Sequence, residues 1–138
     1  MTKNTAPQER PARGRVLFID DDGDTCEMIK LVLRQAGYEV AIGRSVTEGL
    51  RLARAKRFDL ILLDSYFDDG NGIELCRAVR EFDGQTPIFF YTGVAQEQYM
   101  RTVLEAGAQG CFIKPVEMET LLQALAVEIG SNEHGEHQ

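Results

Sequence analysis

Five short runs rich in apolar residues alternate along the chain with longer segments in which apolar residues recur every third or fourth position. A short apolar run is typical of a strand buried on both faces, as in parallel sheets, and the longer spacing is typical of an amphipathic helix. The pattern predicts strands over residues 16–19, 38–43, 58–64, 87–91 and 111–113, and helices over residues 23–36, 72–82, 95–106 and 117–129, with a further helix beginning after Ser45.

The strict alternation of strands and helices indicates an α/β fold with a parallel sheet and helices on both of its faces. We expect a flavodoxin-like, doubly wound sheet of five parallel strands in the order 2-1-3-4-5, a known order of this fold class, with five helices. Residues 1–13 contain prolines and polar residues without periodicity, so we expect a disordered lead there, one folded domain over residues 14–130, and a flexible tail over residues 131–138.

Composition and charge narrow the classes of function. A chain of 138 residues fits a single domain, and its net charge of −7 argues against direct binding of nucleic acid, which needs a basic surface. The apolar stretches are too short to cross a membrane, and the first residues lack the apolar core of a signal peptide, so we expect a cytoplasmic protein. The three cysteines form no CxxC pair and are expected to be reduced.

Chemically capable side chains follow four of the five predicted strands. Asp20 and Asp21 follow the first strand, Asp64 follows the third, and the fourth and fifth end at Thr92 and Lys114. Strands one and three are neighbours in the expected order, so their three carboxylates would crowd into one crevice at the carboxyl edge of the sheet. Carboxylates that lie close together raise each other's pKa unless a cation joins them, and their oxygen atoms suit Mg²⁺ better than Ca²⁺ in a site of this kind.

A carboxylate beside a magnesium ion, an ammonium group and a hydroxyl group can accept a phosphoryl group. In this interpretation Asp64 attacks phosphorus and forms an aspartyl phosphate. Mg²⁺ and Lys114 would neutralise the charge on the phosphoryl oxygens, and Thr92 would donate a hydrogen bond to the transferred group.

These residues, in this order and at these strand ends, resemble the receiver domains of bacterial two-component response regulators, and in particular the stand-alone receivers of chemotaxis. The resemblance covers residues 14–130, nearly all of the chain predicted to be ordered. It depends on the motifs Asp20-Asp21, Asp64, Asn71-Gly72, Thr92-Gly93 and Lys114-Pro115.

The resemblance implies a role for each of these residues. Asp64 would be the phosphoacceptor. Asp21 and Asp64 would bind Mg²⁺ directly, and Asp20 would act partly through water. The backbone carbonyl of Tyr66 would be a further ligand of the metal. The bond between Lys114 and Pro115 is expected to be cis, which X–Pro bonds allow.

The resemblance also implies partners. The phosphoryl group would come from a sensor histidine kinase or from a histidine phosphotransfer protein. The chain would then signal through phosphorylation-dependent contacts with a downstream effector protein, or by phosphorylation-dependent dimerisation, rather than act as an enzyme. Met28 and Leu31, off the core face of their predicted helix, are candidates for a kinase-docking patch, and Tyr99 and Met100 are candidates for an output surface.

Three positions depart from the family's pattern. Asp68 stands where proline is common, and Gly23 stands where proline often opens the first helix. Cys111 stands where the last strand usually carries an aromatic switch residue, and Phe112 cannot replace it because adjacent side chains of a strand face opposite ways. We therefore expect movement of Thr92 to be transmitted through backbone shifts in residues 93–108.

Two other interpretations remain open at this point. The run Asp20-Asp21-Asp22-Gly23-Asp24-Thr25 resembles the Asp-x-Asp-Gly opening of haloacid dehalogenase-type phosphatases, with Asp20 as nucleophile and Asp22 as acid/base. The chain has no later acidic pair that would hold the metal of such an enzyme, and no segment for a substrate cap. The other interpretation is a receiver-like scaffold that is never phosphorylated, although every residue needed for phosphorylation is present.

Overall fold

A sheet of five parallel strands forms the centre of the molecule, in the order β2-β1-β3-β6-β7. These strands are β1 (Gly14–Ile19), β2 (Tyr38–Gly43), β3 (Leu60–Leu63), β6 (Ile88–Thr92) and β7 (Gly110–Ile113). Counted as the first to fifth strands of the sheet, they have the predicted order 2-1-3-4-5. Two further short strands, β4 (Tyr66–Phe67) and β5 (Gly70–Asn71), pair antiparallel as a hairpin in a segment that the sequence analysis treated as a loop.

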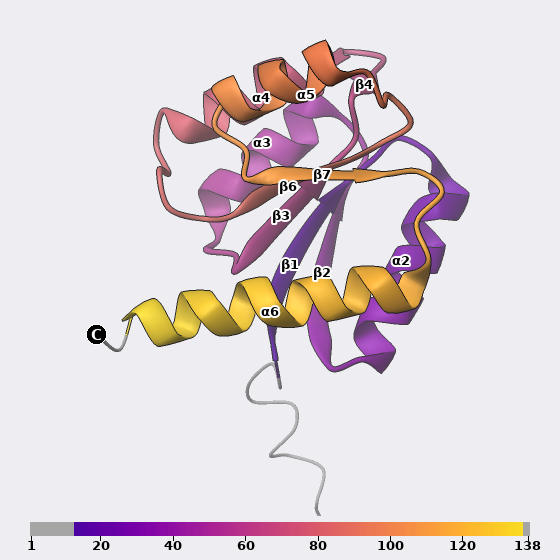
Figure 1. Cartoon of the computed structure of the whole chain (residues 1–138), viewed down its shortest axis with the longest axis vertical. Coiled ribbons are helices and arrows are strands. Elements are labelled where there is room, and N and C mark those ends of the chain that lie inside the picture. Colours follow the sequence, from indigo (N-terminus) through magenta and orange to yellow (C-terminus); the bar gives the residue numbers. More distant parts are fainter. Residues whose placement is uncertain (1–12, 137–138) are drawn as a thin grey trace, which may run out of the picture.

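The helices cover both faces of this sheet, as predicted (Figure 1). Helices α2 (Gly23–Gln35) and α6 (Met118–Glu136) lie on one face, and helices α3 (Val46–Ala55), α4 (Gly72–Arg80) and α5 (Glu97–Glu105) lie on the other. Side chains of β1 alternate between the two layers: Leu17 and Ile19 pack under α3, α4 and α5, whereas Val16 and Phe18 pack under α2 and α6. The run of residues 16–19 in β1 is therefore buried on both sides, which explains its continuous apolar sequence.

The computed structural model describes the backbone of residues 13–136 and the side chains of residues 13–130. The lead predicted over residues 1–13 lies outside the described residues except for Arg13, as do residues 137–138 of the predicted tail. Helix α6 continues to Glu136, so the predicted helix end at Ile129 was wrong. One glycine inside a helix costs about 1 kcal/mol, which is too little to end a helix at Gly130.

Other predicted boundaries differ from the structure by a few residues. Helix α4 ends at Arg80, two residues before its predicted end, and Phe82 is 42% exposed. Its ring instead lies beneath the guanidinium group of Arg54, 5.2 Å from the ring centroid. The third strand ends at Leu63, so Asp64 lies just beyond the strand rather than within it.

The turn that precedes β6 depends on the charge of Asp83. This carboxylate accepts hydrogen bonds from the Thr86 hydroxyl at 2.6 Å and from the amides of Gln85 and Thr86 at 3.0 and 3.1 Å. Burial works to raise the pKa of Asp83, but these hydrogen bonds together hold that pKa below its ordinary value. A carboxylate with a depressed pKa in the folded state stabilises the fold above its unfolded pKa, and this stabilisation is lost as the pH falls through the folded pKa.

We expect Asp83→Asn to lower the free energy of unfolding at neutral pH by about 1 kcal/mol, because a charged hydrogen-bond acceptor is replaced by a neutral one. We also expect the variant to lose less stability than the parent as the pH falls from the unfolded pKa of an aspartate, about 4, through the lower pKa of Asp83 in the folded protein. Urea unfolding at neutral pH and at several acidic pH values measures both effects. An identical acid dependence in parent and variant would contradict the assignment.

Candidate functional site

The strand ends bring the predicted site residues to one edge of the sheet. Asp64 follows β3, and its amide donates to the carbonyl of Ile19 at 3.0 Å, which extends the pairing of β3 with β1 by one residue. The Lys114 amide donates to the Thr92 carbonyl at 2.7 Å and extends the pairing of β7 with β6 in the same way. The backbone therefore fixes the side chains that follow the four strands relative to one another.

Three carboxylates meet at this edge, as predicted. One oxygen from each of Asp20, Asp21 and Asp64 lies within 4.8 Å of the others. Asp20 is fully buried, and this burial raises its pKa, with a contribution from the charge of Asp64, against the lowering effects of the Asp22 amide and of Lys114. Asp64 is partly open, and its Oδ1 accepts a hydrogen bond from the Ser65 amide at 2.7 Å. The site thus combines one buried acid, Asp20, with the exposed Asp21 and the partly open Asp64.

The Lys114 ammonium group lies between two of these carboxylates. Its Nζ is 3.4 Å from an oxygen of Asp20 and 3.5 Å from an oxygen of Asp64, and it lies 5.1 Å from the ring centroid of Tyr91. Burial alone would lower the pKa of Lys114, but the two carboxylates raise it above its ordinary value, so the group stays charged. The bond from Lys114 to Pro115 is cis, as predicted.

The donor set fits a hard divalent cation. The cluster holds three carboxylates and one ammonium group. Burial raises the pKa of one of the carboxylates, Asp20. All the converging ligand atoms are oxygens, and magnesium takes a few carboxylate oxygens while keeping several waters. The cluster as a whole is therefore an acidic site that suits a magnesium ion, in agreement with the expectation from the sequence.

Thr92 is buried beside the acidic cluster and belongs to a chain of hydroxyl groups that the sequence analysis missed. Its Oγ1 accepts hydrogen bonds from the Ser65 hydroxyl at 2.6 Å and from the Val94 amide at 3.1 Å. The Ser65 hydroxyl in turn accepts one from the Tyr99 hydroxyl at 2.7 Å. The sequence analysis placed Tyr99 on an output surface, but its side chain is half-buried and turned toward the sheet. Its spacing of four residues from the buried Val103 was the available signal, because such positions share one helix face.

The loop after Asp64 is held at both of its ends. Asn71 caps α4 by accepting a hydrogen bond from the Glu74 amide at 2.9 Å, and the Gly72 amide donates to the Ser65 carbonyl at 2.8 Å. Asp69 accepts hydrogen bonds from the amides of Val46 and Thr47, at 2.9 and 3.0 Å, at the start of α3. The β4–β5 hairpin is therefore fastened to α3 on one side and to α4 on the other.

Arg44 contributes to the site although its position after β2 looked chemically quiet in the sequence. A guanidinium nitrogen donates to the Asp21 carbonyl at 3.1 Å, and the amide of Arg44 donates to Glu48 at 2.8 Å. The arginine thereby braces the loop that carries two of the carboxylates. Arg44 follows β2 and contacts the backbone of a residue that follows β1, so no local pattern in the sequence indicates this contact.

Asp22 has a structural role. Its carboxylate caps α2 and accepts hydrogen bonds from the Thr25 hydroxyl at 2.5 Å and the Thr25 amide at 2.9 Å. The pKa of Asp22 is lowered by these two bonds, the hydroxyl bond first. A capping carboxylate with a lowered pKa is poorly suited to the acid/base role that the phosphatase interpretation gives it.

The two residues at the centre of β7 face opposite layers, as predicted. Cys111 is half-buried and packs against the core under α5, whereas Phe112 packs under α6 with its ring centroid 5.3 Å from that of Phe89. Phe112 therefore cannot occupy the place of an aromatic residue at position 111. The side of β7 that faces α5 carries only the small thiol of Cys111 at this point.

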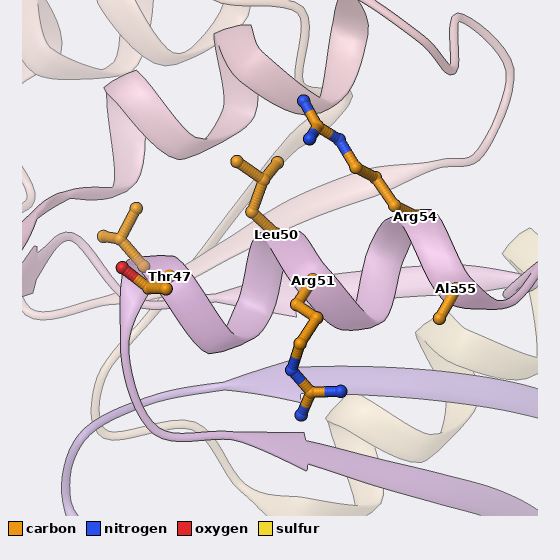
Figure 2. Close-up of a pocket in the computed structure, with 6 residues that line it drawn as sticks. Thr47, Leu50, Arg51, Arg54 and Ala55 are labelled. Carbon is orange, nitrogen blue, oxygen red and sulfur yellow. The ribbon is translucent and has the colours of Figure 1, made fainter.

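A hollow of about 500 Å³ lies apart from this site, along α3 (Figure 2). It is lined by Val46, Thr47, Leu50, Arg51, Arg54 and Ala55, and none of the predicted site residues belongs to it. The carboxyl edge of the sheet, rather than this hollow, carries the reactive groups.

Comparison with known proteins agrees with this geometry. A family model described as the response regulator receiver domain matches residues 16–126. A CheY-like response regulator receiver domain protein from Methanospirillum hungatei JF-1 superposes with a TM-score of 0.84 at 30% identity, covering 88% of this chain and 97% of that one. The non-phosphorylated HemR receiver domain from Leptospira biflexa superposes with a TM-score of 0.78 at 31% identity, covering 83% and 93%.

Longer relatives share the same region. The DNA-binding response regulator MtrA of Mycobacterium tuberculosis is 33% identical over 121 residues, covering 88% of this chain and 53% of that protein. The sensor histidine kinase AruS of Pseudomonas aeruginosa is 35% identical over 132 residues, covering 93% of this chain and 13% of that protein. The chain thus spans about half or less of the length of these curated relatives. Among its described residues, no helix combines the length and the apolar character that crossing a membrane requires.

Proposed function

The chain belongs to the family of response regulator receiver domains, and from this premise we propose that it accepts a phosphoryl group on Asp64. The observation that carries the proposal is the position of the partly open Asp64 carboxylate, which lies 3.5 Å from the Lys114 ammonium group and within 4.8 Å of two further carboxylates. Such a carboxylate is exposed enough to reach a donor and is surrounded by the groups that phosphoryl transfer needs.

In the proposed step, an oxygen of Asp64 forms a bond to phosphorus. The bond from phosphorus to the imidazole nitrogen of a donor phosphohistidine breaks, and its electron pair stays with the imidazole, which takes up a proton. The product is an acyl phosphate on Asp64 and a neutral histidine on the donor.

We assign the surrounding residues as follows. Asp20, Asp21 and Asp64 would hold a magnesium ion, with the Tyr66 carbonyl as a further ligand, and the bound ion supplies positive charge to the phosphoryl oxygens during transfer. Lys114 supplies a second positive charge, from an ammonium group 3.5 Å from an oxygen of Asp64. Thr92 donates its hydroxyl hydrogen to the transferred group.

The partners follow from this chemistry. The donor is a sensor histidine kinase or a histidine phosphotransfer protein, and Met28 and Leu31, 43% and 60% exposed on α2, offer an apolar patch for it. The output is a contact with an effector protein or with a second copy of the chain. The net charge of −7 disfavours direct binding of nucleic acid by this domain. We infer a phosphoacceptor rather than an enzyme that turns over a separate substrate. We also place the protein in the cytoplasm, where its free cysteines would stay reduced.

The test is uptake of phosphoryl groups from acetyl phosphate, followed by intact mass spectrometry. In the presence of Mg²⁺ we expect the mass of one phosphoryl group to be added and to be removed by hydroxylamine, as for an acyl phosphate. With EDTA in excess, the uptake is expected to cease, because the carboxylates then face the phosphoryl oxygens without the magnesium ion. Restoring Mg²⁺ is the control. An unphosphorylated chain under all conditions would support the scaffold interpretation instead.

A further inference from the structure

Three hydroxyl groups form a continuous chain from helix α5 to the strand-end site. The Tyr99 hydroxyl donates to Ser65 Oγ at 2.7 Å, and the Ser65 hydroxyl donates to Thr92 Oγ1 at 2.6 Å. Ser65 and Thr92 are each 1% exposed, so water does not compete for these bonds. Ser65 also directly follows Asp64, whose carboxylate accepts from the Ser65 amide. The chain thus begins on a helix, passes through the residue next to Asp64 and ends at Thr92.

The bonding of Thr92 leaves it able to respond to a new acceptor. Its oxygen already accepts two hydrogen bonds, from Ser65 and from the Val94 amide, and the remaining capacity of a hydroxyl that accepts two bonds is to donate its own hydrogen. Phosphoryl oxygens on Asp64 are charged acceptors, and charge-assisted hydrogen bonds are roughly twice as strong as neutral ones. A movement of the Thr92 side chain toward a phosphoryl group would carry its oxygen away from the Ser65 hydroxyl, which donates to it at 2.6 Å.

The small side chain at position 111 makes room for Tyr99. Cys111 pairs in register with Phe90, and the Tyr99 ring meets the Phe90 ring edge-on with centroids 6.3 Å apart. Tyr99 and Cys111 pack against the same apolar core. An aromatic side chain at position 111 would compete with the Tyr99 ring for this space.

Helix α5 itself is lightly anchored. Its single fully buried side chain is Val103, and its N-cap residue Gln96 makes no side-chain capping bond. An element with few buried side chains moves at low cost in free energy. The hydrogen bond of Tyr99 is therefore a substantial part of what ties the first turn of α5 to the sheet.

We propose that the hydroxyl chain Tyr99–Ser65–Thr92 reports the phosphorylation of Asp64 to helix α5, in place of the aromatic switch residue that Cys111 replaces. The proposal rests on the proposed function. Reorientation of Thr92 toward the phosphoryl group takes away the acceptor of the Ser65 hydroxyl. The Ser65 hydroxyl then turns to a new acceptor, its oxygen no longer faces the Tyr99 hydroxyl that donates to it, and α5 shifts away from the sheet edge. Tyr99 and Ser65 are positioning residues in this scheme, because neither touches the transferred group.

Fluorine NMR of the full chain labelled with 3-fluorotyrosine tests the proposal. The chain has four tyrosines, and Tyr→Phe variants assign their resonances. Addition of Mg²⁺ and beryllofluoride, a stable mimic of the phosphoryl group, is expected to move the Tyr99 resonance. The resonance of Tyr38, which belongs to the opposite core, is expected to stay in place. In Ser65→Ala, the Tyr99 resonance is expected to lose this response while the protein still shows the resonances of bound beryllofluoride.

A response of Tyr99 of the same size in Ser65→Ala would overturn the proposal, because the charge at Asp64 would then act on the ring directly. An unmoved Tyr99 resonance in the parent with beryllofluoride bound would overturn it too. Neither result touches the proposed function, which fails only if the parent gains no phosphoryl group from acetyl phosphate.

A second measurement serves if Ser65→Ala does not fold. Amide hydrogen exchange of residues 97–105 is expected to speed up in the parent on beryllofluoride binding. In Tyr99→Phe, which keeps the ring and removes only the hydroxyl, exchange is expected to be fast already and to change no further. A full beryllofluoride response in Tyr99→Phe would contradict the relay.

Discussion

The Asp64→Asn variant is expected to take up no phosphoryl group from acetyl phosphate and Mg²⁺ under conditions in which the parent is phosphorylated. An amide has the size of the carboxylate but lacks the anionic oxygen that attacks phosphorus, and it cannot form an acyl phosphate. Lys114, 3.5 Å away, and the carboxylates of Asp20 and Asp21 remain in place, so the variant removes the nucleophile and keeps the surroundings. Intact mass spectrometry over a time course measures the loss directly.

Asp20→Asn is the matched control, since it changes a neighbouring carboxylate in the same way. If Asp20 acts on the metal partly through water, the variant is expected to be phosphorylated about 10–100-fold more slowly than the parent, and still on Asp64. Far-UV circular dichroism checks that the buried substitution leaves the fold intact. The phosphatase interpretation requires the reverse order, with complete loss in Asp20→Asn and activity in Asp64→Asn. The capping role of Asp22 already argues against that interpretation.

Gly72→Ala is expected to lower the free energy of unfolding by at least about 3 kcal/mol, at the upper end of what overpacking of a core costs. A Cβ atom on Gly72 would lie 2.8 Å from Cε2 of Phe90 and 2.9 Å from Cδ1 of Leu63, and closer still to the Asp64 carbonyl oxygen. The first contact could be relieved by a side-chain movement, but the last one involves the backbone of Asp64. Urea unfolding of parent and variant measures the difference.

Gly84→Ala is the control for this substitution. A Cβ atom there would meet nothing within 4 Å, so its effect on stability is expected to stay within about 0.5 kcal/mol. The folded fraction of the Gly72→Ala protein is also expected to be phosphorylated more slowly than the parent, because the clash displaces Asp64. A Gly72→Ala variant as stable as Gly84→Ala would show that the crevice is looser than its contacts indicate.

The parts of the site that were predictable from the sequence are those in which a strand ends abruptly in a polar residue. Asp20, Asp64 and Lys114 each follow an apolar run, and parallel strands bring such ends together whatever the details of packing. The family resemblance then gave the roles of these residues. The position of the cluster therefore follows from the topology of the sheet. The alternation of strands and helices along the sequence indicates that topology.

Ser65 and Tyr99 were not predictable in the same way. Serine after an aspartate is common in turns, and nothing local shows that its hydroxyl lies between two others. The spacing of Tyr99 from Val103 indicates that Tyr99 lies on the inner face of α5, but the partner of its hydroxyl depends on where α5 lies over the sheet. Side-chain contacts of this kind are set by tertiary packing, so the pattern within one helix does not determine them.

The crevice around Asp64 is held by hydrogen bonds on one side, where Asp69 lies, and more loosely on the other. On one side, two backbone amides of α3 hold the hairpin that follows Asp64, and Asn71 and Gly72 hold it to α4. On the other side, the segment from Gly93 to Gln96 leads to a helix with one buried residue. If Asp64 is phosphorylated, we expect the added dianion to displace the segment after Thr92 rather than the hairpin, because the hairpin is held by more hydrogen bonds.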